Sequence, residues 1–84
     1  TTSAMAPYLT AVFLFSTPAP SACGRAYEAV VAVARRESNF GYAQEVSREG
    51  RPAFISACRR HLTGAQVRCI VRARSSDELY ACTP

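Results

Sequence analysis

The chain has 84 residues, which predicts a single domain whose hydrophobic core is too small to be stable by packing alone. All ten basic residues are arginines, against six acidic residues, for a formal net charge of +4. These arginines are spread over the C-terminal two thirds of the chain, which argues against specific nucleic-acid binding and leaves a solvated surface or contact with an anionic envelope surface.

Residues 1–22 contain no charged side chain, and we expect them to form an extended apolar arm ahead of a helical domain at residues 23–84. Within the arm, residues 8–16 are aromatic and apolar and lie between Pro7 and Pro18, which stop a helix from growing in either direction. A helix of nine residues is about 13 Å long, against about 30 Å of bilayer hydrocarbon. The arm is therefore not expected to span a membrane.

Three interpretations of the arm are open. It is a retained secretion signal, a strap over the protein's own helices, or an arm that docks on a neighbouring chain by adding a strand to a sheet edge or by filling a groove. The functional hypothesis is the docking arm, which binds a protein partner or a second copy of the chain through residues 7–18. The predicted contact residues are Tyr8, Leu9, Val12, Phe13, Leu14 and Phe15.

From Cys23 onward the apolar residues recur at intervals of three and four, which predicts a helix from Cys23 to about Glu37. Asn39 and Gly41 favour its termination, and residues 39–50 are expected to form a loop or a short irregular turn.

Two further helices and a short last one are expected after this loop. Pro52 suits the first turn of a helix, which should carry Phe54, Ile55, Cys58 and Leu62 on one face. Thr63 and Gln66 form a capping-box pattern that starts the next helix, which carries Val67, Ile70 and Val71. Ser75 and Glu78 repeat that pattern before a last helix with Leu79, Tyr80 and Cys82.

The four cysteines are Cys23, Cys58, Cys69 and Cys82, separated by 35, 11 and 13 positions. Zinc sites prefer ligand pairs two to four residues apart, so this spacing favours two disulfides over a metal site, and no cofactor is expected. Distances from the two predicted turns favour two pairings, Cys58–Cys69 with Cys23–Cys82 or Cys69–Cys82 with Cys23–Cys58. Disulfides in turn indicate an extracytoplasmic location, namely periplasm, cell surface or medium.

One stretch of this sequence resembles a pattern in small exported cysteine-containing helical proteins of high-GC bacteria, myxobacteria among them. That family has no established activity, and the resemblance implies export and disulfides only. The matching positions are Phe54, Cys58, Leu62, Thr63, Gln66, Cys69, Ala73, Leu79 and Cys82.

The segment from Arg36 to Phe40 resembles the Glu-Ser-x-Phe segment of lysozyme-like lytic transglycosylases, which implies Glu37 as a general acid. The sequence departs from that family where Ser47 and Gly50 each fall one residue late, and it lacks the glycine-rich stretch that should follow. An ordinary glutamate at a helix end is the favoured interpretation, and no enzymatic activity is predicted. His61 is interpreted as a surface histidine, and the tyrosines Tyr27, Tyr42 and Tyr80 as the edge of an amphipathic core or a partner-binding surface.

The sequence thus predicts a mainly α-helical, disulfide-stapled bundle of three or four short helices with an apolar N-terminal arm. The leading functional hypothesis is a non-catalytic structural or accessory subunit of an extracytoplasmic assembly. Two alternatives are a secreted cationic peptide that binds anionic membranes or cell-wall polymers, and a wall-cleaving enzyme that uses Glu37.

Overall fold

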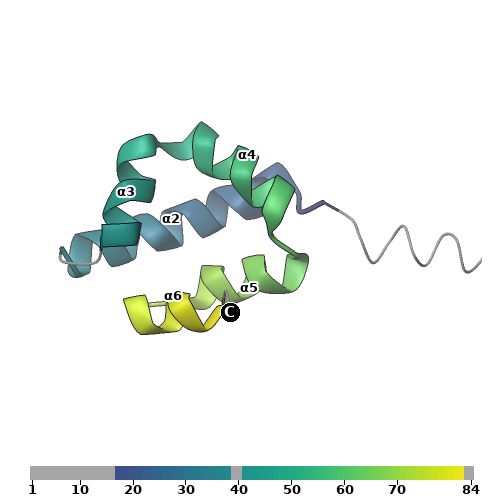
Figure 1. The fold of residues 1–84 in the computed structure, drawn as a ribbon. Helices are drawn as coiled ribbons and strands as arrows, with labels where there is room; N and C mark the ends of the chain where they lie inside the picture. The colour runs from purple at the N-terminus through teal and green to yellow at the C-terminus, as the bar shows by residue number, and fades with distance from the viewer. Residues whose placement is uncertain (1–16, 39–40, 83–84) are drawn as a thin grey trace, which may run out of the picture.

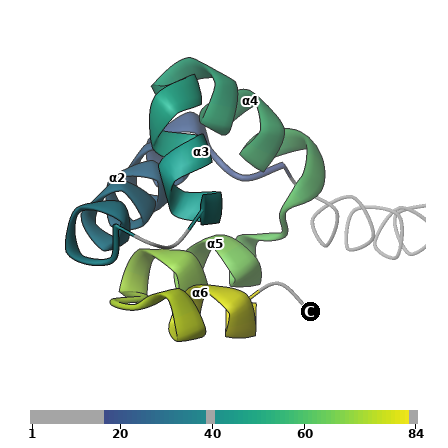
Figure 2. The same cartoon turned by 60° about the vertical axis from the view of Figure 1, so that its left-hand side comes forward.

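A computed structural model describes residues 17–38 and 41–82. In these ranges the regular secondary structure is entirely α-helix. Its helices are α2 (Pro20–Arg36), α3 (Gly41–Glu49), α4 (Arg51–His61), α5 (Gly64–Arg72) and α6 (Ser76–Cys82). The long helix α2 runs through the middle, with α3 and α4 on one side of it and α5 and α6 on the other (Figures 1 and 2). The predicted fold class, a small disulfide-stapled helical bundle, is confirmed.

Helix α2 is central because it packs against α3, α4 and α5. Cys23, Ala26, Val30 and Val33 are almost completely buried, and their spacing of three and four residues places them along one stripe. Small residues at Cys23 and Ala26 let neighbouring helices approach the backbone closely. The helix begins at Pro20, three residues earlier than expected, because proline in the first turn has no N–H to leave unpaired.

Helix α3 occupies most of residues 39–50, and the prediction of a loop there was wrong for residues 41–49. Ala43 and Val46 are buried in the common core, so the helix is stabilised by tertiary packing rather than by its own polar sequence. Gln44 adds a second tie, since its side-chain amide donates to the Ala34 carbonyl oxygen at 2.8 Å. That carbonyl belongs to the last turn of α2, where backbone acceptors lack helical partners.

The starts of α4 and α5 follow the predicted local signals. Gly50 adopts a φ of 94°, which a residue with a side chain rarely adopts, and Pro52 lies in the first turn of α4. At α5 the capping box is complete: Thr63 Oγ1 accepts from the Gln66 N–H at 3.1 Å, and Gln66 Oε1 accepts from the Thr63 N–H at 2.9 Å.

The start of α6 keeps only half of its predicted capping box. Ser75 Oγ accepts from the Glu78 N–H at 3.2 Å, but the Glu78 carboxylate accepts from the Arg74 N–H instead of from Ser75. Glu37, at the end of α2, supplies further capping through its bonds to Ser76. The first turn of α6 is thereby tied to the central helix.

The disulfides are Cys23–Cys58 and Cys69–Cys82, with Cα–Cα distances of 6.0 and 5.6 Å. This is one of the two pairings that the sequence favoured. The first disulfide joins α2 to α4 and the second joins α5 to α6, so no covalent link other than the backbone connects α5 and α6 to α2. The interface between α2 and α5 is therefore held by apolar packing.

Candidate functional site

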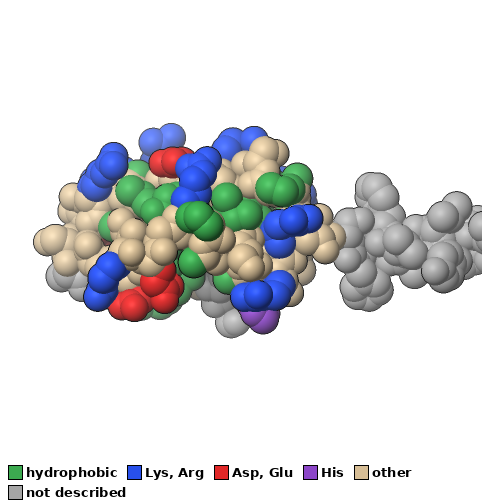
Figure 3. All heavy atoms as spheres, turned by 90° about the horizontal axis from the view of Figure 1, so that it is seen from above, with side chains coloured by type: hydrophobic (Ala, Val, Ile, Leu, Met, Phe, Trp, Pro, Cys, Tyr) green, Lys and Arg blue, Asp and Glu red, His purple; other side chains and the backbone are tan. Residues whose placement is uncertain are grey.

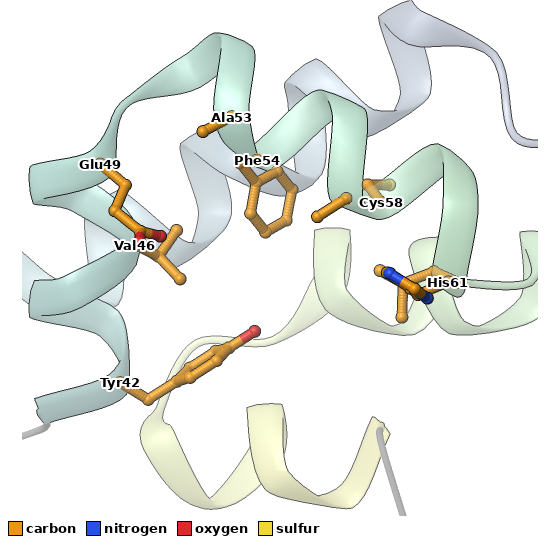
Figure 4. Close-up of a pocket in the computed structure, with 9 residues that line it drawn as sticks. Tyr42, Val46, Glu49, Ala53, Phe54, Cys58 and His61 are labelled. Atoms are coloured by element: carbon orange, nitrogen blue, oxygen red, sulfur yellow. The ribbon is translucent and has the colours of Figure 1, made fainter.

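An apolar groove of about 280 Å³ lies between α3 and α4 and is a candidate binding site (Figure 4). Helix α3 contributes one wall, and α4 with the residue after it contributes the other. The lining residues are Tyr42, Val46, Glu49, Ala53, Phe54, Ala57, Cys58, His61 and Leu62.

The groove exists because α3 and α4 both pack mainly on α2 and touch each other much less. The Gly50 turn reverses the chain between them, and the Phe54 N–H donates to the Gly50 carbonyl oxygen at 3.2 Å, which starts α4 immediately. Val46 and Cys58 are buried at the base of the groove. The disulfide from Cys58 to Cys23 holds α4 on α2 and so fixes the position of that wall.

The Phe54 side chain forms part of the α4 wall and packs against Tyr27 on α2. Its ring lies 5.7 Å from the ring of Tyr27 on α2, and the Arg51 guanidinium lies 6.0 Å from the centre of that tyrosine ring. Arg51 also forms an ion pair with Glu28. These contacts restrain the phenylalanine, so the groove wall is preorganised rather than formed on binding.

Polar groups surround the apolar groove. Tyr42 reaches across from the start of α3, with its hydroxyl toward the space between the helices, while Glu49 and His61 lie at opposite ends (Figure 4). An apolar interior with a few polar groups at its rim is typical of a pocket that receives a side chain or a small ligand. The chemistry that this arrangement can perform is binding.

Glu37 does not have the environment of a general acid. Its carboxylate accepts hydrogen bonds from the Ser76 hydroxyl at 2.7 Å and from the Ser76 backbone N–H at 3.1 Å. These two bonds, with a smaller contribution from the nearby Arg36 charge, hold the pKa of Glu37 below its ordinary value. An acid catalyst at neutral pH needs a raised pKa, so these contacts favour a structural role.

The Glu37–Ser76 contact predicts a specific loss of stability in acid. The pKa of Glu37 is lower in the folded state than in the unfolded state. The contact therefore stabilises the fold fully above about pH 4.3, the ordinary pKa of a glutamate. This stabilisation is lost as the pH falls through the pKa of the folded state. In Glu37→Gln the free energy of unfolding should fall less steeply below that pH. Chemical denaturation from pH 2 to 7 measures this, with Glu45→Gln, whose carboxylate pairs with Arg48 rather than with Ser76, as the comparison. Equal slopes in both variants would contradict the assignment.

The structure places some of the predicted site residues and leaves others outside its range. All four cysteines form the disulfides described above, and no cysteine is free. Tyr8, Leu9, Val12, Phe13, Leu14 and Phe15 lie outside the described residues. Of the predicted arm at residues 1–22, residues 17–22 are described. Residues 20–22 belong to α2, so the prediction of an extended arm was wrong for them. Pro18 is buried, and its carbonyl oxygen accepts from Arg59 Nε on α4 at 3.2 Å.

The groove was missed by sequence reasoning because the α3 wall was interpreted as loop. The available signal was the spacing of Tyr42, Val46 and Glu49 at intervals of four and three, with no glycine or proline between them.

Of the three tyrosines, Tyr42 is 55% exposed in the groove and Tyr80 is 62% exposed on α6, whereas Tyr27 is half-buried against Phe54. His61 is exposed, as predicted.

Within residues 17–38 and 41–82 no group of three or more histidine, cysteine or acidic side chains is placed to hold a metal ion. Among the described helices, none combines the length and the apolar character needed to cross a bilayer.

No protein-family model, no curated protein and no solved structure matches this chain.

Proposed function

We propose that this protein is a non-catalytic accessory subunit of an extracytoplasmic assembly, and that it docks through the apolar arm at residues 7–18. The observation that carries the proposal is the contrast between a charge-free arm and a body locked by two disulfides. An uncharged run such as Ala11–Phe15 is prone to aggregation if it stays in water, so a covering partner is favoured.

The attachment of the arm to the body supports the same proposal. Pro18, the last residue of the arm, is buried, and its carbonyl oxygen accepts a hydrogen bond from Arg59, so this end of the arm is held beside α4. An arm held at its base loses less conformational freedom when it binds, and this raises affinity. The disulfides support an oxidising compartment, where such bonds persist.

Site-specific photo-crosslinking in producing cells tests the proposal. A photoreactive residue in place of Phe13 should give one defined crosslinked species, either with a second copy or with a partner identified by mass spectrometry. The same residue in place of Tyr80, which is exposed on α6, is the control and should not give that species. A full-length chain that stays monomeric by light scattering and shows no Phe13-specific crosslink would refute the docking arm.

A further inference from the structure

Several arginines make no ion pair or hydrogen bond through their guanidinium groups within the described residues, and three of these arginines lie on one face of the molecule. Others are engaged within the described residues, through ion pairs of Arg48 with Glu45 and of Arg51 with Glu28, and through hydrogen bonds that the side chains of Arg36 and Arg59 donate to backbone carbonyl oxygens. On the face that carries α3 and α4, basic and acidic side chains lie together around a hydrophobic centre (Figure 3). On the face between α2 and α5 the guanidinium groups of Arg25, Arg68 and Arg72 make no ion pair or hydrogen bond to any described residue.

These three arginines line one hollow of about 140 Å³ between α2 and α5. The rest of its lining is apolar, from Ala22, Val67 and Val71, and it includes no acidic side chain. Arg68 and Arg72 stand one helical turn apart, a spacing at which like charges repel. Arg25 adds a third positive charge from the neighbouring helix.

The hollow is built into the packing of the two helices. Its floor includes Val67, which is 2% exposed and belongs to the core between α2 and α5. The Arg68 side chain is folded back along α5, with Nη1 3.3 Å from the position that a Cβ on Gly64 would occupy. Glu78 lines an adjoining hollow together with Arg68 and Arg72, and its carboxylate accepts from the Arg74 N–H.

We propose that this hollow is a binding site for a phosphate group, presented by the headgroups of an anionic phospholipid surface. Guanidinium groups match phosphate oxygens with paired N–H donors, and a bound phosphate offsets the repulsion that the three positive charges impose on one another. The lipid source is favoured over a free phosphate because Val71 is 38% exposed beside the arginines and offers apolar contact at the headgroup boundary. This site is in the helical body and does not depend on the proposed role of the arm.

Two triple variants of the full-length chain with equal net charge test the site. The site variant removes the three arginines of the hollow and carries Arg25→Gln, Arg68→Gln and Arg72→Gln. The control variant removes three arginines that do not line this hollow and carries Arg35→Gln, Arg60→Gln and Arg74→Gln. Binding is measured by sedimentation with phosphatidylglycerol vesicles, with phosphatidylcholine vesicles as the uncharged reference. The site variant should lose about 100-fold in vesicle affinity, because each basic residue at an anionic surface contributes about a factor of five, and the control variant should lose less than tenfold.

A second arm of the experiment separates the two sources of phosphate. Inorganic phosphate is titrated into each isotope-labelled chain, and amide chemical shifts of α2 and α5 are followed by NMR. Phosphate binding that only the site variant abolishes, without vesicle binding, supports the site and assigns it to free phosphate. Equal losses in the two triple variants, or no binding to vesicles and phosphate, would overturn the proposal; retained helical circular dichroism in both variants excludes unfolding as the cause.

Discussion

Replacing Cys23 and Cys58 together by alanine is expected to lower the free energy of unfolding by about 4 kcal/mol. The two residues are 35 positions apart, and closing a loop of that length restricts the unfolded chain by about this amount in the chain-entropy model. Both side chains are also buried, at 0% and 2% exposure, so their packing in the core is lost as well. A chain of 84 residues is stable by roughly 4–13 kcal/mol, and the variant should be largely unfolded at the lower end of that range.

The second disulfide provides the matched comparison. Cys69 and Cys82 are 13 positions apart, for which the same model gives about 3 kcal/mol, and Cys69 is exposed so that less packing is lost. Urea denaturation followed by circular dichroism measures both pairs under the same conditions. If removal of Cys69–Cys82 cost more than removal of Cys23–Cys58, the link from α2 to α4 would not be the principal covalent restraint of the fold.

The next largest effect is expected at the interface between α2 and α5. Ile70→Ala should lower the free energy of unfolding by about 3 kcal/mol, because Ile70 is 6% exposed and its truncation leaves a cavity in the core. No disulfide holds α5 and α6 against α2, so that cavity weakens the apolar packing that keeps the two halves together. Beside this packing there are the hydrogen bonds that Ser76 donates to Glu37 and that Arg36 donates to the Arg74 carbonyl oxygen.

The adjacent residue supplies the control for this measurement. Val71→Ala removes apolar atoms one position further along α5, but Val71 is 38% exposed, and the change should stay within about 0.5 kcal/mol. Thermal and urea unfolding of the two variants tests the orientation of α5 directly. Similar costs at Ile70 and Val71 would show that the helix does not present the face described above.

The candidate groove shows why a site can escape sequence reasoning while the fold does not. Its α4 wall was predicted, because Phe54 and Cys58 recur with helical spacing behind a proline that starts a helix. Its α3 wall was not, because Gly41 and Gly50 frame a polar segment whose buried side chains, Ala43 and Val46, are few and small. That helix depends on contact with α2, which no local pattern contains.

Local chemistry in the sequence determined the mainly helical class, the starts of α4 and α5, and the restriction of the cysteines to two favoured disulfide pairings. These features depend on residues close to one another in the chain, such as Thr63 with Gln66, or on loop lengths that spacing alone defines. Tertiary structure decided which pairing forms, converted the expected loop into α3, and turned Glu37 into a cap for α6. It also brought Arg25 on α2 beside Arg68 and Arg72 on α5, because helix packing joins residues that lie more than 40 positions apart in the chain.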